Sequence, residues 1–230
     1  NKIPAITETT RELIFYTEKP SSKEFINRSY STLNRVLEDI VSKKDDENQF
    51  ENCYVFYGSP WYDSKIRNIE VKEKSQKELT EKYLENLIRN SYKDTNVKEL
   101  LEQKFMSAAL NGYKTKEPLN KKFKKIEITF FESILHEETL KDINQIIRSS
   151  TGIDEVNHRT HPLTIYEFIS KKFEPIDNYT ILDISGEITE ATIVKKDEIK
   201  RTVTIPHGSH FFVRGLAQKC NLDFINSFSK

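Results

Sequence analysis

Cysteine, glycine and tryptophan are scarce in this chain of 230 residues, which has two, six and one of them. The two cysteines, Cys53 and Cys220, form no CxxC pair and have no obvious ligand partner, which excludes a disulfide framework and a thiolate zinc site. We expect reduced, partly buried thiols of a cytosolic protein. No run of about 18 apolar residues occurs, which excludes a hydrophobic membrane-spanning helix within this sequence.

An excess of one charge is also missing, because Lys plus Arg and Asp plus Glu number 36 each. This balance gives no global electrostatic reason to bind nucleic acid, and we expect no nucleic-acid partner. The one lysine-rich run, KKFKK (121–125), is interpreted as a solvated strand flank. Fourteen Phe and ten Tyr argue against intrinsic disorder and for a packed core.

Apolar spacing along the chain alternates between the helical and the strand type. Helices are expected over 23–43 with Ser22 as N-cap, 76–92, 97–112, 136–150, 164–173 and 208–220. A fully buried strand is expected within 53–62, broken by a tight turn at Gly58-Ser59-Pro60. Further strands are expected over 64–73 and 124–135, and in a final run of three with turns at Ser185-Gly186 and Lys196-Asp197. This mixture predicts an α/β protein.

The segment ILDISGEITEATIV (181–194) has the chemistry of a phosphate-binding hairpin. A carboxylate such as Asp183 at the end of a buried strand suits a hydrated Mg²⁺ ion. The small residues Ser185 and Gly186 allow backbone N–H groups to approach a phosphate, and the Thr189 hydroxyl adds a contact. The same pattern also makes an ordinary hairpin turn, so these residues alone leave both interpretations open.

Residues 181–217 resemble the second phosphate-binding motif of the actin-like ATPase superfamily, in its FtsA/PilM branch. The motif reads D-x-G-G-G/E-x-T-D, two strands, P-x-G and a helix, and here its positions are Asp183, Ser185, Gly186, Glu187, Thr189, Glu190, Pro206 and Gly208. Upstream, 110–135 is similar to the L-N-G-Y-x-T-x-x-P segment and following strand of that branch's inserted subdomain. Residues 59–71 look like the entry into this insertion.

The resemblance implies an actin-like (ribonuclease H-like) ATPase fold, apparently incomplete, with an inserted α/β subdomain of the FtsA/PilM type. The implied segments are 1–62 as the first part of one lobe, 63–150 as the insertion, 151–180 as the return to the lobe, and 181–230 as the opening of the second lobe. The first phosphate loop and the adenosine-binding glycines of the family are not in this sequence. We therefore expect a fragment with about half a nucleotide site.

In a complete family member, the resemblance places Asp183 near Mg²⁺, with a water between them. Ser185, Gly186, Glu187 and Thr189 would cradle the phosphates of ATP, and Gly208 would allow a close turn before the next helix. Three positions depart from the motif, with Ser185, Glu190 and Ser209 in place of Gly, Asp and Gly. We expect at most weak ATPase activity from the full-length protein and none from this chain alone. ATP and Mg²⁺ are the possible cofactors, and it is also plausible that this chain binds neither.

The resemblance implies a cytoplasmic ATP-binding scaffold of cell division or of type IV pilus-like machinery, acting as a nucleotide switch at the inner face of the membrane. Its expected partners are further copies of itself and a peptide of a membrane protein, with only indirect membrane contact. The alternative is a nucleotide-free adaptor of the same fold that binds such a peptide. In a third interpretation, an interaction domain without nucleotide history, Asp183 only forms a turn.

Other candidate residues favour structural roles. The pair His158-x-x-His161 is expected in a loop, with a surface or capping role rather than a metal. His207 and His210 flank Gly208; either could face a phosphate, and solvent exposure is the simpler expectation for both. Two further kinds of candidate are weak: Ser59 and Ser185 lack a G-x-S-x-G context, and Trp61 fits either core packing or an interaction surface.

Overall fold

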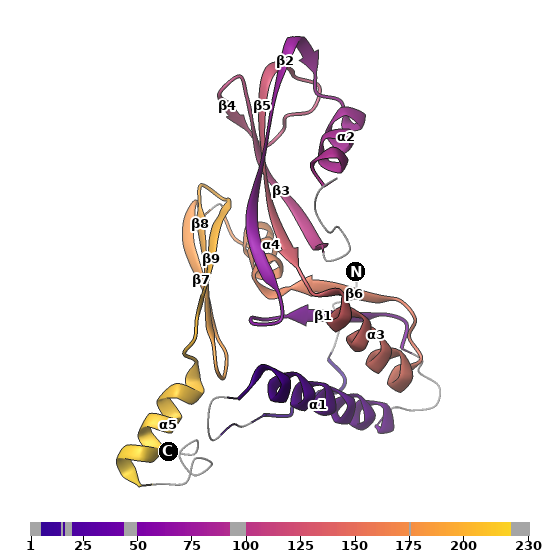
Figure 1. Ribbon diagram of the computed structural model, residues 1–230, viewed down its shortest axis with the longest axis vertical. Helices are drawn as coiled ribbons and strands as arrows, with labels where there is room; N and C mark the ends of the chain where they lie inside the picture. The colour runs from indigo at the N-terminus through magenta and orange to yellow at the C-terminus, as the bar shows by residue number, and fades with distance from the viewer. Residues whose placement is uncertain are drawn as a thin grey trace. The chain divides into compact units, whose positions relative to one another are not determined.

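The computed structural model describes residues 6–14, 16, 20–43, 50–92, 100–174 and 176–221, and Figure 1 labels their helices and strands. The chain divides into two compact units. Unit 1 takes its residues from 1–55, 137–157 and 213–230, and unit 2 from 56–136 and 158–212. The four segments implied by the family resemblance stay predictions.

The elements follow in chain order as α1 (Ser22–Ser42), β1 (Cys53–Tyr57), β2 (Asp63–Glu78), α2 (Glu81–Ser91), β3 (Leu100–Leu110), β4 (Tyr113–Thr115), β5 (Lys122–Ile134), α3 (Glu137–Thr151), β6 (Val156–Thr160), α4 (His161–Lys172), β7 (Asn178–Ile184), β8 (Thr189–Lys195), β9 (Ile199–Ile205) and α5 (Ser209–Cys220). Strands and helices mix along the chain, which confirms the α/β class. None of the described helices combines the length and the apolar character that crossing a bilayer requires.

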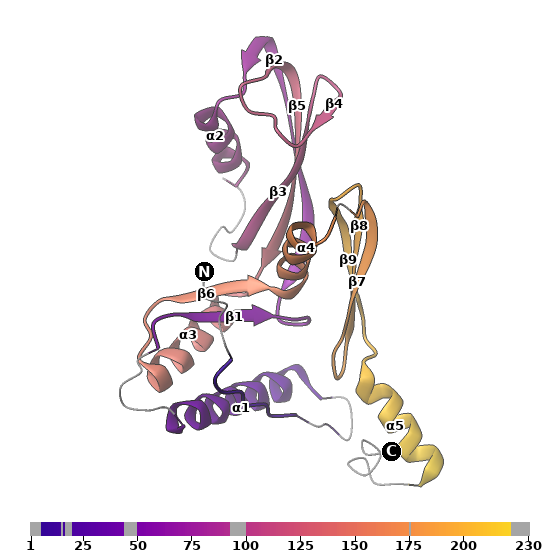
Figure 2. The same cartoon turned by 180° about the vertical axis from the view of Figure 1, so that it is seen from behind.

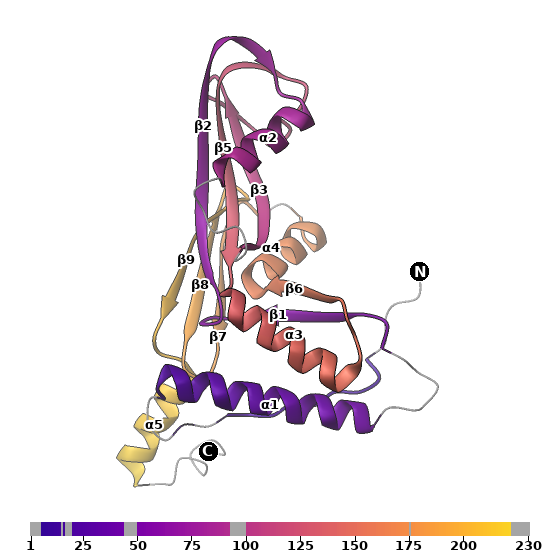
Figure 3. The same cartoon turned by 45° about the vertical axis from the view of Figure 1, so that its right-hand side comes forward.

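Unit 1 is built on two helices, α1 and α3, which lie side by side (Figure 3). Helix α1 begins where the Ser21 hydroxyl accepts a hydrogen bond of 3.2 Å from the Glu24 N–H group. The predicted N-cap, Ser22, is therefore wrong by one position, because Ser22 already has helical geometry. Both serines satisfy the N-cap preference, so composition does not separate them.

Unit 2 contains a four-stranded antiparallel sheet in the order β2-β5-β3-β4 (Figure 2). Helix α2 covers one face of it and packs Tyr83, Leu84 and Leu87 against the core. The buried members of this core are Leu79, Ala108, Leu110, Phe123, Ile126, Ile128 and Phe130. The strands of this sheet span 63–134 and lie within the segment 63–150 that the resemblance assigned to the inserted subdomain.

The predicted helix over 97–112 is wrong where the structure describes it, since Leu100–Leu110 form strand β3. Residues 97–99 lie outside the described part. Leu, Glu, Gln and Ala give this stretch a helical composition, but β3 pairs with β5 on one side and β4 on the other. The strand ends at Asn111-Gly112, where both residues have positive φ and make the tight turn into β4.

The predicted helix over 76–92 begins later, at Glu81. Residues up to Glu78 continue β2, because Lys77 and Glu78 still pair with β5. Leu79 is fully buried, and the Thr80 hydroxyl then caps α2 by accepting from the Tyr83 N–H at 3.2 Å. Strand pairing therefore prevails over the helical spacing of the first few residues.

Strand β1 was expected to be fully buried and to lead into a tight turn at Gly58-Ser59-Pro60; the turn is confirmed, and the full burial is wrong. The strand ends at Tyr57, and the side chains of Tyr54 and Phe56 are 59% and 53% exposed. Its sheet has only one other strand in the described part of the chain, β6. The chain then turns through Gly58-Ser59-Pro60, with a cis peptide bond before the proline.

The second sheet of unit 2 has the order β7-β8-β9, and its strands and turns lie where the sequence predicted them. It shares a hydrophobic core with α4 and with the four-stranded sheet: Met106, Phe131, Leu163, Tyr166, Val194 and Ile199. Helix α4 begins at His161, three residues before the expected start, with Pro162 in its first turn, where proline is tolerated.

Candidate phosphate-binding site

The turn between β7 and β8 brings the predicted site residues to one end of the three-stranded sheet. Asp183 pairs with Glu190 and Ile184 with Thr189, and the Ser185 N–H closes the turn on the Ile188 carbonyl at 3.0 Å. Strand β7 alternates strictly between half-buried and exposed side chains. It is therefore not the buried strand that the sequence predicted, because the described chain covers only one of its faces.

Two glycines hold this turn against the start of α5. A side chain at Gly208 would place Cβ 2.4 Å from the carbonyl oxygens of Ser185 and Gly186, so only glycine fits there. These carbonyls accept hydrogen bonds from the Ser209 and His210 N–H groups at 2.9 and 2.8 Å. The first amides of α5 thus donate to carbonyls of the β7–β8 turn, so this turn and the start of α5 are joined backbone to backbone.

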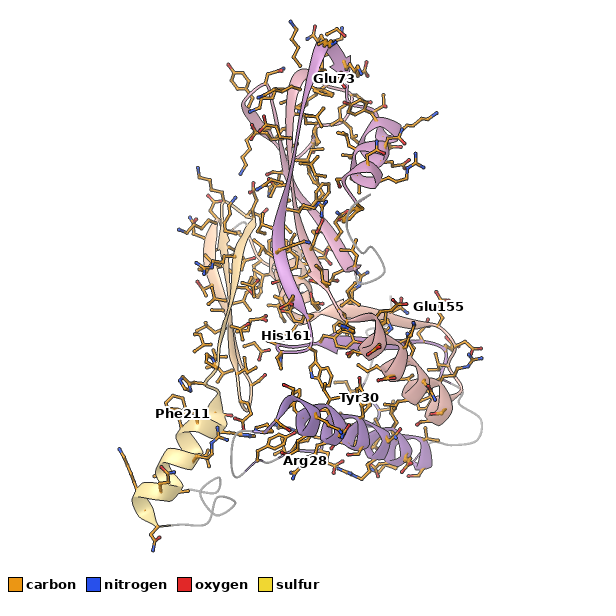
Figure 4. All side chains as sticks on the ribbon, in the orientation of Figure 1. Arg28, Tyr30, Glu73, Glu155, His161 and Phe211 are labelled. Carbon is orange, nitrogen blue, oxygen red and sulfur yellow. The ribbon has the colours of Figure 1, made fainter. Side chains whose placement is uncertain are left out.

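The Asp183 carboxylate is contacted from three directions. Its Oδ2 lies 3.2 Å from Nδ1 of His161, and its Oδ1 accepts from the Ser185 hydroxyl at 3.4 Å. A Cβ added to Gly58 would lie 3.5 Å from Oδ2, so the turn after β1 also borders this acid. His161 stands at the start of α4 (Figure 4), not in the loop expected for His158-x-x-His161.

Sequence reasoning missed His161 as a neighbour of Asp183. The two residues are 22 positions apart and belong to different elements, so no local spacing indicated the contact. The Pro162 that suggested a loop instead starts the helix. His158 lies in β6, where Nδ1 is 2.8 Å from the Tyr57 hydroxyl and burial lowers the pKa of the imidazole.

Glu190, at the position of the motif's terminal acid, is buried and bonded to Tyr62. The Tyr62 hydroxyl donates to Oε1 of Glu190 at 2.6 Å. Burial raises the pKa of the Glu190 carboxyl and the charge on Asp183 raises it further, although Tyr62 and His161 act in the opposite direction. Burial, followed by the hydrogen bond to Glu190, also raises the pKa of the Tyr62 hydroxyl above its usual value.

The remaining polar groups of the turn also have protein partners. The Thr189 hydroxyl donates to the His207 carbonyl at 2.8 Å, and Nδ1 of His210 lies 3.1 Å from Oε1 of Glu187. His210 is buried against Gly186, so the expectation that it is exposed is wrong; His207 is exposed, as expected. The imidazole of His210 fills the space that a side chain at position 186 would need.

The structure thus gathers all six predicted residues, Asp183, Ser185, Gly186, Glu187, Thr189 and Gly208, at one end of the β7-β8-β9 sheet. Their roles in binding stay predictions. The site offers carboxylates and hydroxyls, which are the oxygen donors that Mg²⁺ prefers. Within the described residues, no three His, Cys, Asp or Glu side chains form a cluster that holds a metal by itself. A cation here would need ligand or water oxygens as well.

Comparison with known proteins gives similarity in structure but not in sequence. No protein-family model matches the sequence, and no curated protein matches it significantly. Among solved structures, a chain of the PilM-PilN type IV pilus biogenesis complex superposes with a TM-score of 0.53 at 14% identity. The match covers 86% of this chain and 54% of that one, so the chain spans about half the length of the protein it resembles.

Two further solved structures overlap with lower TM-scores. The ethanolamine utilization protein EutJ from Carboxydothermus hydrogenoformans gives 0.32 at 16% identity, covering 40% of this chain and 32% of that one. A protein of unknown function with an actin-like ATPase fold from Bacteroides thetaiotaomicron gives 0.34 at 8% identity, covering 83% and 63%. At identities this low, likeness concerns the fold. The chain shares the fold of the matched chain of the PilM-PilN complex, over about half of that chain's length.

Proposed function

We propose that this protein is an assembly scaffold of a type IV pilus-like machine and that the β7–β8 turn binds the phosphates of Mg²⁺-ATP. The scaffold role is supported by the similarity, over 86% of the chain, to a component of a pilus biogenesis complex. In this role the protein works at the cytoplasmic face of the inner membrane. It associates with further copies of itself and with a peptide of a membrane protein.

The nucleotide part of the proposal rests on one observation, the close packing around Gly186 and Gly208. A side chain at Gly208 would overlap backbone carbonyls, and one at Gly186 would meet the His210 imidazole at 2.7 Å. The two glycines bring the β7–β8 turn and the start of α5 together beside the Asp183 carboxylate. Asp183 would hold Mg²⁺ through water, while the Ser185 and Thr189 hydroxyls face the phosphates. Bound Mg²⁺ would neutralise the charge that phosphate adds to an end of the sheet already rich in carboxylates.

A second candidate function is a nucleotide-free adaptor of the same fold. It is favoured by the hydrogen bonds from the Ser209 and His210 amides to carbonyls of the β7–β8 turn. Amides used in this way do not point at a phosphate unless the two turns separate. The Thr189 hydroxyl, likewise, donates to the His207 carbonyl. In the adaptor, the contact between Asp183 and His161 has a structural role, and only the partner peptide is bound.

Titration calorimetry of the full-length protein with Mg²⁺-ATP separates the two functions. We expect micromolar binding that weakens at least tenfold in Asp183→Ala. The matched control is Asp177→Ala, which removes an exposed acid just before the other end of β7 and should leave the affinity unchanged. Absence of binding by the folded wild-type protein contradicts the nucleotide site and favours the adaptor. Equal losses in both variants contradict the role given to Asp183.

A further inference from the structure

The β8–β9 turn, at the opposite end of the same sheet, is attached to the four-stranded sheet by ion pairs. Nζ of Lys114, on β4, lies 2.8 Å from Oε1 of Glu198, and Lys116 pairs with Asp197. Lys196 and Asp197 both have positive φ, which sets the tight turn that presents the two acids. The lysines belong to the β3–β5 connection, some 80 residues away in sequence.

Helix α4 holds the same turn from another side. The Tyr166 hydroxyl donates to the Asp197 carbonyl at 3.0 Å, and the Ser170 hydroxyl donates to Oδ1 of Asp197 at 3.2 Å. Asp197 therefore contacts both α4 and the β3–β5 connection. A turn held by charged and neutral partners on two elements has less freedom than a hairpin turn in solvent.

A continuous hydrophobic core lies beneath these contacts. Val194 and Ile199, on either side of the turn, are 1% and 0% exposed and pack with Met106 of β3 and Phe131 of β5. Shared buried side chains of this kind transmit displacement, because protein interiors are close-packed. Strand β8 then runs from this core to Thr189, in the β7–β8 turn, over about 20 Å.

We propose that the β8–β9 turn couples the four-stranded sheet to the β7–β8 turn. Loosening the lysine contacts of Asp197 and Glu198 then lowers the affinity of the β7–β8 turn for its ligand. As a regulation of nucleotide binding, this inference rests on the function proposed above. As a coupling between two turns, it is measurable without any nucleotide. Because coupling is reciprocal, a ligand at one end also tightens the lysine contacts at the other.

The test is the double variant Lys114→Met, Lys116→Met, which keeps the aliphatic side chains and removes both charges. Its matched control is Lys122→Met, Lys124→Met on β5, two exposed lysines for which the described part of the chain shows no carboxylate partner. Hydrogen–deuterium exchange of the full-length protein without nucleotide reports on both turns. We expect exchange about two- to tenfold faster at 195–199 and also at 185–190 in the test variant, and no change in the control.

Faster exchange at 195–199 alone, or at neither turn, overturns the coupling. A second arm, calorimetry with Mg²⁺-ATP, should show binding about fivefold weaker in the test variant than in the control. Unchanged affinity in a protein that binds nucleotide overturns the regulatory role. If the wild-type protein binds no nucleotide, the nucleotide part of the proposed function fails, and the exchange experiment still decides the coupling.

Discussion

The two ends of the β7-β8-β9 sheet each bury a glutamate, and they shift the pKa of its carboxyl in opposite directions. Glu190, at the β7–β8 end, is 5% exposed, and Glu198, at the β8–β9 end, is 3% exposed. Burial raises the pKa of the Glu190 carboxyl, and Asp183 adds to the rise. Burial acts in the same direction on Glu198, but hydrogen bonds from Lys114, Lys200 and Ser107 outweigh it and lower the pKa.

Partner charge, rather than depth of burial, decides the ionisation of these two groups. The β8–β9 end satisfies its carboxylates with lysines and so has no need of an external cation. The β7–β8 end partners its acids with imidazoles and with the hydroxyls of Tyr62 and Ser185. A cation such as Mg²⁺ would therefore gain more at this end, which is why the nucleotide proposal is placed there.

The largest expected effect comes from removing both lysines that contact Glu198. Lys114→Met with Lys200→Met should lower the free energy of unfolding at pH 7 by about 3 kcal/mol, because a buried carboxylate then keeps no cationic partner. Urea denaturation measures it. The control Lys122→Met, Lys124→Met removes the same charge from the surface and should change stability by less than about 0.5 kcal/mol. Equal losses in the two variants would contradict the importance of the Glu198 contacts.

Gly208→Ala should disrupt the β7–β8 end by steric overlap. Its Cβ would meet backbone carbonyls at 2.4 Å, and we expect a loss of about 1–3 kcal/mol in the free energy of unfolding. Gly215→Ala, in the interior of α5, meets nothing within 4 Å and should be about 0.5–1 kcal/mol more stable than the wild type. Thermal unfolding of both variants tests this pair. A Gly208→Ala protein as stable as the wild type would show that the β7–β8 turn and the start of α5 do not pack as described.

The opposite pKa shifts predict opposite pH dependences. Because the pKa of Glu190 is raised above its usual 4.5, this residue contributes stability at pH values below 4.5. That contribution is lost as the pH rises through the folded-state pKa. Glu190→Gln should remove this loss, so the variant should become more stable than the wild type as the pH rises toward neutral.

The lowered pKa of Glu198 contributes stability above pH 4.5, which is lost as the pH falls through the folded-state pKa. Glu198→Gln should therefore be less stable than the wild type at neutral pH.

Urea denaturation between about pH 2 and pH 8 measures both slopes, because the Glu198 slope lies below about pH 5 and the Glu190 slope lies above about pH 4. The two variants serve as controls for each other, because the substitution is the same and both side chains are buried in the same sheet. Parallel pH profiles would show that the two ends of the sheet do not differ as the contacts indicate.

The three-stranded sheet was predictable because its signals are local. Apolar and polar residues alternate along each strand, and Lys196-Asp197 and Ser185-Gly186 supply the turns. Strand β3 was not predictable in this way. Its residues have helical propensities, and its strand geometry comes from pairing with β5, a strand that follows it along the chain.

The candidate site was predictable in its residues but not in its contacts. The motif named Asp183, Gly186 and Gly208, and the structure brings them to one end of the sheet. The partners that define their chemistry, His161 on Asp183 and Tyr62 on Glu190, come from elements 22 and 128 residues away. Such contacts arise from tertiary packing, which neither periodicity nor a local motif describes.

The most direct test of the nucleotide site uses Mn²⁺ in place of Mg²⁺ and backbone amide NMR of the full-length protein. Bound Mn²⁺-ATP broadens the signals of nearby amides according to distance, and the two turns are separated by about 20 Å along β8. We expect broadening first at 183–190 and 208–210, well before 195–199, and we expect Asp183→Ala to abolish it. Broadening centred on 195–199, or none at saturating Mn²⁺-ATP, would contradict a phosphate site at the β7–β8 turn.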